Sequence, residues 1–283
     1  MSRWQRTLKQ PLRFAGVGLH SGEKVAIRVL PAPENSGIVF RTSSQSCAIP
    51  ALIANVDARK ITNAFVDFEG DNLNSVELPV LDGSSIEYIE GIRRVGVQDQ
   101  AATLNYLRIK RPVQVFKQDK AAWLLPMPED LSSSPLSLQA PTLHMSVQVN
   151  FAHKQLDTTF CRFSLGSDTD DTINTFEREI AAARTFTFEE EIEWMQANGL
   201  AQGGSLDNAV VFSTDDTSTV LNAEGLRYPD EWTRHKMLDC IGDIGLAGLP
   251  LHGYFFATSP GHALTHELLR ELFKDPENYE EVN

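Results

Sequence analysis

Cysteine, long apolar runs and basic charge are all scarce in this 283-residue sequence. The three cysteines, Cys47, Cys161 and Cys240, are widely spaced and odd in number, which argues against a disulfide framework and excludes a paired-cysteine zinc motif. No apolar run approaches the length of a membrane span, so we expect no stable membrane insertion. The formal net charge of −13 argues against a nucleic-acid partner. Because no paired-cysteine motif is present, any metal site must use histidine and carboxylate ligands.

The remaining composition is typical of a globular protein in a reducing compartment. Hydrophobic residues make up 42% and charged residues 22%, and the length suits one large domain or two ordinary ones. Residues 1–6 include no apolar stretch of the kind found in a signal peptide. These features predict a cytoplasmic protein, or an organellar one if a longer eukaryotic precursor exists.

Strand patterns precede helix patterns twice along the chain, which predicts an α+β fold. Alternating or β-branched residues predict strands at 5–9, 24–29, 37–40, 63–68, 106–110, 113–116, 122–125, 144–151, 158–163, 208–212 and 252–257. Helical spacing predicts helices at 85–92, 172–183, 188–198, 231–247 and 262–273. We therefore expect two domains of similar sheet-plus-helix design, at 1–100 and 104–283, with a polar separator at 98–100 and a surface loop at 128–142.

The helix predicted at 231–247 carries the most suggestive polar pattern. His235, Asp239 and Asp243 recur every four residues and so lie along one side of the helix, after Asp230 as a plausible N-cap. A histidine and an aspartate one turn apart can place a nitrogen and an oxygen on one zinc ion. Asp243 suits an acceptor for another histidine. Spacing alone favours a plainer interpretation, a surface helix with a basic–acidic pair.

Three further features gain meaning only in combination. A Pro-Gly turn delivers His262 to the start of a helix, where it could act as an acid, cap the helix or simply pack. Thr185 ends an inter-helix segment and could donate to an oxyanion, although an ordinary loop threonine is the commoner case. Phe188, Ile192 and Met195 form an apolar stripe, which is usually core but can line an apolar substrate channel.

Six motifs occur together in one order. They are Gly-Val-Gly-Leu-His-Ser-Gly at 16–22, Leu-Asp-Gly-Ser at 81–84, Ala-Arg-Thr-Phe at 183–186, Gly-Gly-Ser-Leu-Asp-Asn-Ala at 203–209, Arg-His-Lys-Met-Leu-Asp at 234–239 with Ile-Gly-Asp at 241–243, and Gly-His-Ala-Leu at 261–264. With these motifs the chain resembles the UDP-3-O-acyl-N-acetylglucosamine deacetylases, zinc amidases that commit a sugar nucleotide to lipid A synthesis. The resemblance implies two α+β domains packed face to face, a Zn²⁺ cofactor between them and a monomer acting on UDP-3-O-acyl-N-acetylglucosamine.

The resemblance also implies roles for residues in the matching motifs. His235 and Asp239 match two of the three zinc ligands of the family. His262 matches the catalytic histidine, and Asp243 matches the carboxylate that orients it. Thr185 matches the hydroxyl that stabilises the tetrahedral oxyanion.

Substrate binding is implied for a second set of positions. Lys236 matches a lysine near the substrate phosphates. Residues 188–200 match the insert that forms the passage for the acyl chain, and we expect Phe186 and Ile192 to contact the substrate there.

One family segment is missing from the first domain. Relatives carry Thr-Val-Glu-His-Leu at the start of a helix, where the Glu is the general base and the His is the third zinc ligand. Here Asn-Val-Asp-Ala-Arg-Lys at 55–60 runs directly into Ile-Thr-Asn-Ala-Phe at 61–65, and nothing between 42 and 84 has a helical period. The first domain is thus expected to lack a family helix near 57–63. His20, in a turn that the family places near the active site, is the one alternative third ligand.

Loss of a general base typically costs roughly a hundredfold to ten-thousandfold in rate, and two ligands should hold zinc more weakly than three. Three hypotheses follow. The chain is a working deacetylase with replacement groups, a non-catalytic relative that only binds the UDP-sugar or acyl ligand, or an incomplete gene model of the active enzyme. The clean loss between intact flanks favours the third.

Overall fold

The structure, a computed structural model, describes residues 4–41, 61–69, 77–128, 142–151, 156, 158–166, 175–214 and 219–283. Three predicted features fall partly outside these residues. They are the junction at 57–63, the loop at 128–142 and the first residues of the helix predicted at 172–183. Among the described helices, none is long and apolar enough to cross a membrane.

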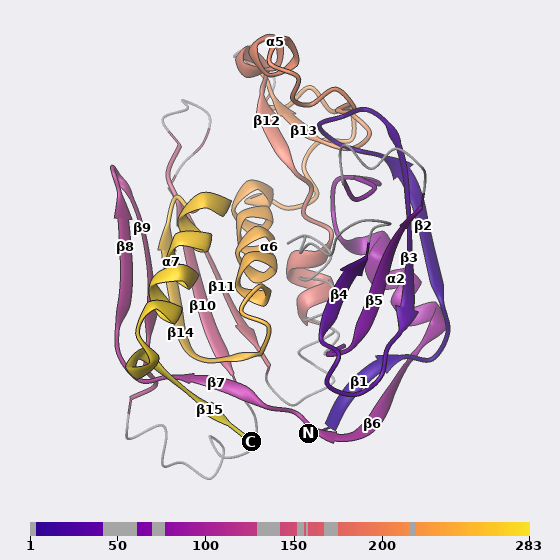
Figure 1. The fold of residues 1–283 in the computed structure, drawn as a ribbon. Helices are drawn as coiled ribbons and strands as arrows, with labels where there is room; N and C mark the ends of the chain where they lie inside the picture. The colour runs from indigo at the N-terminus through magenta and orange to yellow at the C-terminus, as the bar shows by residue number, and fades with distance from the viewer. Residues whose placement is uncertain are drawn as a thin grey trace.

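A four-stranded sheet in the order β2-β3-β5-β4 forms the main layer of the first half (Figure 1). Its strands are β2 (Leu12–Val17), β3 (Lys24–Pro31), β4 (Ile38–Arg41) and β5 (Ala64–Glu69). Alternation along β2 and β3 buries Phe14 and Ile27 in the same core cluster as Ile92 of helix α2 (Ile86–Val95). Strands β1 (Trp4–Leu8) and β6 (Val97–Thr103) form a separate antiparallel pair.

A seven-stranded mixed sheet forms the second half. Its strands are β7 (Tyr106–Ile109), β8 (Val113–Lys117), β9 (Lys120–Leu125), β10 (Leu143–Val149), β11 (Thr159–Leu165), β14 (Leu251–Thr258) and β15 (Tyr279–Val282). Strand β14 lies at its centre, with β10 parallel on one side and β9 and β7 sharing the other. Helices α6 (Glu231–Gly245) and α7 (His262–Lys274) pack on this sheet, and the short 3-10 helix η2 (Pro276–Asn278) leads into β15.

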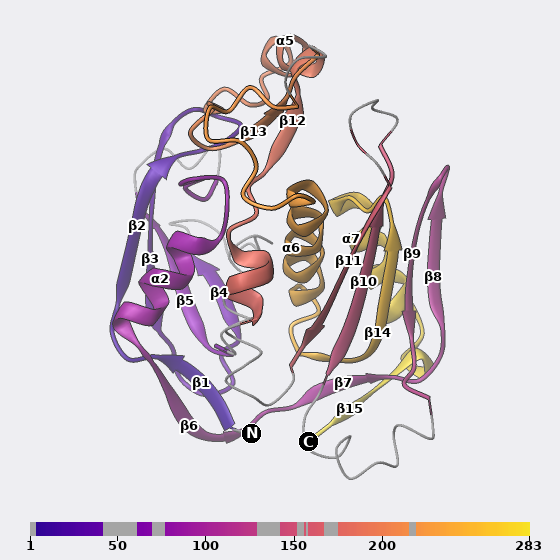
Figure 2. The ribbon, with the colours of Figure 1, turned by 180° about the vertical axis from the view of Figure 1, so that it is seen from behind.

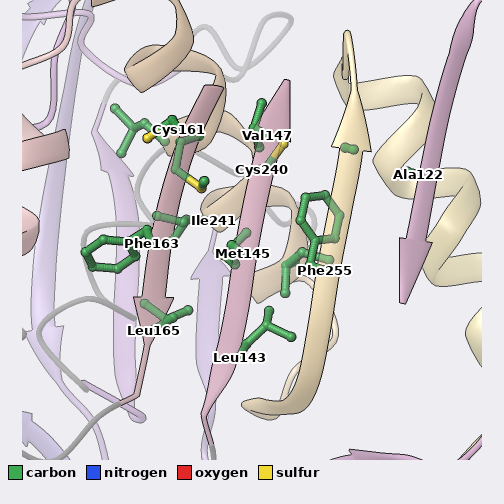
Figure 3. Packing of buried hydrophobic residues seen from close by; sticks show 14 of the residues in the cluster. Ala122, Leu143, Met145, Val147, Cys161, Phe163, Leu165, Cys240, Ile241 and Phe255 are labelled. Carbon is green, nitrogen blue, oxygen red and sulfur yellow. The ribbon is translucent and has the colours of Figure 1, made fainter. Parts of the chain in front are cut away.

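Helix α6 is fixed by its apolar face. Leu238, Ile241 and Ile244 occupy neighbouring positions of that face and are 6%, 0% and 2% exposed. Figure 3 shows Ile241 and Cys240 among the inward side chains of β10, β11 and β14. Because this face is buried, the polar side of α6 that carries the four-residue repeat is oriented away from the sheet.

Helix α6 and the π-helical turn η1 (Glu177–Ala181) lie between the two sheets in both views (Figures 1 and 2). Helix α2 contacts η1, and Ile89 of α2 belongs to the core cluster of the second half. The predicted α+β class is confirmed, and no helix occurs within 61–69 or 77–85. The domain boundaries at 100 and 104 stay a prediction.

A small βαβ unit projects from one end of the second half (Figure 1). It consists of β12 (Phe186–Phe188), α5 (Glu189–Ala197) and β13 (Val210–Phe212), and β12 and β13 pair in parallel. Helix α5 has no buried residue, and Trp194 is 63% exposed. Of the predicted apolar stripe, Ile192 and Met195 are half-buried on this helix, whereas Phe188, just before it, packs against the core of the second half. The substrate-channel interpretation stays a prediction.

The structure adds details that the sequence did not predict. The polar stretch at 98–100 lies in the middle of β6, whose backbone pairs with β1 and needs no apolar side chains. Its role as a separator of two domains stays a prediction. Asp230, the predicted N-cap of α6, makes no side-chain cap, and neither does Ser85 at the N-cap position of α2. Instead, Ser85 Oγ donates to the Ala181 carbonyl and Asp230 Oδ1 accepts from Arg234 Nε.

Candidate functional site

His235 and Asp239 lie side by side on α6, as their spacing predicts. His235 Nε2 is 3.4 Å from Asp239 Oδ1, and His235 Nδ1 is 3.0 Å from the carbonyl oxygen of Ala183. A carbonyl only accepts, so Nδ1 carries the proton and Nε2 presents a lone pair toward the carboxylate. Burial lowers the pKa of His235, which keeps the ring neutral at pH 7. Two lone-pair donors facing one another suit a cation.

Asp239 is held in its ionised form. Burial opposes ionisation, but the electrostatic interactions with Lys236, His235 and His262 outweigh it, and the pKa of Asp239 falls to about 2. Lys236 Nζ donates to Asp239 Oδ2 at 2.9 Å and lies 5.5 Å from the centre of the Phe186 ring. That ring meets His235 edge-on at 6.3 Å between centroids. Phe186 and Lys236, both predicted to bind substrate, thus border the histidine–aspartate pair.

Asp243 lies one turn further along α6 and holds His262. His262 Nδ1 is 3.0 Å from Asp243 Oδ1 and 3.1 Å from Oδ2, while the aspartate is only 1% exposed. The hydrogen bond that His262 donates to Asp243 is the main cause of a raised pKa for His262. An imidazole with a raised pKa and a buried carboxylate on one nitrogen is suited to general-acid work from its other nitrogen. His266 Nε2 also contacts Asp243 Oδ1, at 3.1 Å.

Thr185 is positioned by two motifs from distant parts of the sequence. Its backbone N–H donates to the Gly83 carbonyl, and its own carbonyl accepts from Val210 N–H, both at 2.8 Å. Gly83 has a φ of +81°, and a Cβ there would lie 1.9 Å from the Asn208 carbonyl oxygen, so the close approach requires glycine. Within the part of the chain that the structure describes, the Thr185 hydroxyl has no hydrogen-bond partner and is available to a ligand.

A buried ion pair that the sequence analysis missed anchors the same segment. Arg184 and Glu231 are each 1% exposed, and Arg184 Nε and backbone N both donate to Glu231 Oε1 at 2.9 Å. Arg184 also donates to the Gly225 carbonyl and to Glu224. Glu231 opens α6, so the pair ties the loop carrying Ala183 and Thr185 to the start of the helix carrying His235. The only sequence signal is that Arg184 lies within the Ala-Arg-Thr-Phe motif.

His20 lies at the βαβ unit. Its carbonyl accepts from Gln202 N–H at 3.1 Å, its ring Nδ1 lies 3.4 Å from Ala201 N, and its own N–H donates to Glu77. The turn at 16–22 therefore anchors the loop that follows α5, the helix that contains Ile192. Ile192 itself is half-buried and lies on α5.

The donor set fits zinc only in part. A neutral imidazole and an ionised carboxylate are ordinary zinc ligands, but a catalytic site normally has three protein ligands. Within the described ranges, no group of three or more His, Cys, Asp or Glu side chains could hold a metal ion. His20 therefore does not complete the pair of His235 and Asp239 in this structure.

Fold and site together define an α+β protein in which one helix, between two sheets, carries two histidine–carboxylate contacts. A family model described as UDP-3-O-acyl N-acetylglycosamine deacetylase matches residues 5–65 and 48–274. The chain belongs to this deacetylase family.

Similar curated proteins carry the corresponding name, UDP-3-O-acyl-N-acetylglucosamine deacetylase. The chain is 36% identical to the protein from Chromobacterium violaceum over 300 residues, covering 98% of this chain and 92% of the relative. It is 36% identical to that of Shewanella sp. strain W3-18-1 and 37% identical to that of Shewanella loihica, each over 304 residues, 99% of this chain and 93% of the relative. The similarity therefore spans both halves of the fold.

Proposed function

We propose that this protein hydrolyses the acetamide of UDP-3-O-acyl-N-acetylglucosamine in a zinc-dependent reaction, the committed step of lipid A biosynthesis. The observation that carries the proposal is the paired geometry on α6, where His235 meets Asp239 and Asp243 meets His262. The names of relatives that match nearly the whole chain support the substrate. The monomeric state and the cytoplasmic location stay predictions.

His235 and Asp239 would hold the zinc ion, and the Ala183 carbonyl would keep His235 Nε2 free to do so. Zinc, when bound, supplies Lewis acidity at the amide carbonyl and lowers the pKa of water. In the hydrolysis, the water would give a proton to the general-base Glu of the missing segment as its oxygen joins the acetyl carbon, the carbon–nitrogen bond would break, and the amine would leave with a proton from His262.

The remaining residues bind and orient the substrate. His262 Nε2, the nitrogen not bonded to Asp243, delivers the proton to the leaving amine. Thr185 offers its hydroxyl to the developing oxyanion. Lys236 binds a substrate phosphate, while Phe186 and Ile192 contact the sugar and acyl parts.

We also propose that the sequence lacks a Thr-Val-Glu-His-Leu-type segment between Lys60 and Asn63. The family model matches in two pieces that overlap at residues 48–65, around this junction. The alignments run to 300 and 304 positions, more than the 283 residues of the chain, so each relative has residues with no counterpart here. The overlap of the two matches supports a deletion in the first half, and the alignment lengths support missing residues without locating them.

Restoring the segment tests both proposals. The purified chain, a version with Thr-Val-Glu-His-Leu inserted between Lys60 and Asn63, and a matched insert with Glu and His replaced by Gln and Ala are compared for acetate release. We expect zinc-dependent release from the first insert only. Full activity in the unmodified chain, with a transcript that truly lacks the segment, contradicts the deletion account. Inactivity of the correctly folded, zinc-loaded insert contradicts the proposed reaction.

A protein that binds without catalysis is the second candidate. It is favoured by the two-ligand donor set of the described residues. Such a protein binds the UDP-sugar, measurable by calorimetry, yet releases no acetate with or without zinc. Sequencing the transcript across codons 56–64 separates this candidate from an incomplete gene model.

A further inference from the structure

Two histidines of α7 converge on one carboxylate of α6. His262 and His266 are four residues apart, so both project from the same side of α7. His262 Nδ1 lies 3.0 Å and His266 Nε2 lies 3.1 Å from the same atom, Asp243 Oδ1. The rings are 6.3 Å apart at their centroids and tilted by 33°. Asp243 is 1% exposed, whereas His266 is 32% exposed.

The chemistry of the acceptor fixes the protons. An ionised carboxylate only accepts hydrogen bonds, so each histidine must present an N–H to it. His262 is then protonated on Nδ1 and His266 on Nε2. The Nε2 atom of His262 stays free for a substrate. The Nε2 atom of His266, in contrast, is used in its bond to Asp243. The two rings therefore have different tasks.

Few other charges act on this cluster. From α6, Lys236 opposes the protonation of His262, and Asp239 and Asp243 favour it. On α7, Glu267 follows His266 and is exposed. Strands β8 and β9 also pack on α7, whereas the charged groups that shift the pKa of His262 lie on α6. Among the described residues, His266 is thus the only side chain besides His262 that donates a hydrogen bond to Asp243 Oδ1.

We propose that His266 is a positioning residue that holds the Asp243 carboxylate through a second N–H···O bond and so limits how strongly that carboxylate retains the proton of His262. An acceptor oxygen shared between two N–H donors leaves less acceptor strength for each. The consequence is a general acid that stays oriented yet releases its proton more readily than it would beside an unshared carboxylate. The catalytic meaning rests on the proposed function of His262, but the hydrogen bonding does not.

Nitrogen-15 NMR of the histidine rings tests this on the intact purified chain, without any need for activity. In the wild type above pH 8, we expect the Nδ1–H tautomer for His262 and the Nε2–H tautomer for His266. His266→Phe keeps ring volume but removes the donor, and should raise the His262 pKa by about half a unit or more. His266→Gln restores a neutral donor and should bring the value back, and Glu267→Gln is the matched control on the same helix.

Three results overturn the proposal. One is a His262 pKa that is the same in His266→Phe, His266→Gln and the wild type. Another is an Nδ1–H tautomer at His266 in the wild-type spectrum, which requires no variant to fold. The third is an equal shift in Glu267→Gln, which assigns the effect to general helix electrostatics. None of these results depends on acetate release, so failure here is distinct from failure of the proposed reaction.

Discussion

Replacing Arg184 with methionine should destabilise the second half of the protein severely. The guanidinium and the Glu231 carboxylate are each 1% exposed and are joined by hydrogen bonds of 2.9 and 3.2 Å. Removing one partner leaves the other charge buried and uncompensated, which typically costs about 3–5 kcal/mol. Because a domain is usually stable by only about 5–15 kcal/mol, this loss is a large share of the total.

Urea unfolding followed by circular dichroism measures the change as a shift in midpoint at constant slope. Arg108→Met is the matched control, since Arg108 pairs with Glu280 at 2.6 Å on the surface, where the side chains are 46% and 40% exposed. An exposed pair is worth about 0–1 kcal/mol. If Arg184→Met costs no more than this control, the buried pair does not anchor the loop.

A double variant separates the pair from its surroundings. Arg184→Met combined with Glu231→Leu removes both charges, so its loss should be smaller than the sum of the two single losses. The coupling matters for function because Arg184 lies between Ala183, whose carbonyl orients His235, and Thr185. Additive losses would show that the two side chains act separately and that the buried ion pair does not hold the loop to α6.

Three further predictions concern the site. In a chain with the restored segment, Thr185→Val should lower kcat roughly a hundredfold to a thousandfold without a change in unfolding midpoint, because the hydroxyl has no partner among the described residues. Asp243→Asn removes the main cause of the raised His262 pKa, so the basic limb of the pH–rate profile should move to lower pH. In the metal-free chain, the Asp239 pKa of about 2 lies below the ordinary 3.8, so its stabilisation is complete above about pH 5 and disappears as the pH falls toward 2. Between about pH 5 and pH 2, the free energy of unfolding of the wild type should therefore fall by about 2 kcal/mol more than that of Asp239→Asn.

Helical spacing is what made α6 predictable. The period of four placed His235, Asp239 and Asp243 on one side, and the buried Leu238 and Ile241 fix that side away from the sheet. Most strands of the seven-stranded sheet were predictable for a similar reason, since alternation reports burial directly, but β15 (Tyr279–Val282) was not predicted. Strand β6 was not, because backbone pairing with β1 supports a polar sequence.

Contacts between distant segments could not be predicted from local sequence patterns. Arg184 and Glu231 are 47 residues apart, and neither residue type predicts a buried partner from its neighbours. His266 follows His262 by one helical turn, so a shared orientation was visible, but a common acceptor on α6 depends on how two helices pack. Likewise, only the structure reveals that His20 lies at the loop after α5.

Zinc titration of the chain with the restored Thr-Val-Glu-His-Leu segment tests the central claim most directly, namely that His235 and Asp239 are two of three ligands of one catalytic zinc. Acetate release and bound zinc are measured in the same samples, beside the unmodified chain and the His235→Ala and Asp239→Ala variants of the restored chain. We predict that activity rises to its maximum at one equivalent of zinc in the restored chain alone. Undiminished zinc binding and acetate release after loss of His235 or Asp239 would contradict the account.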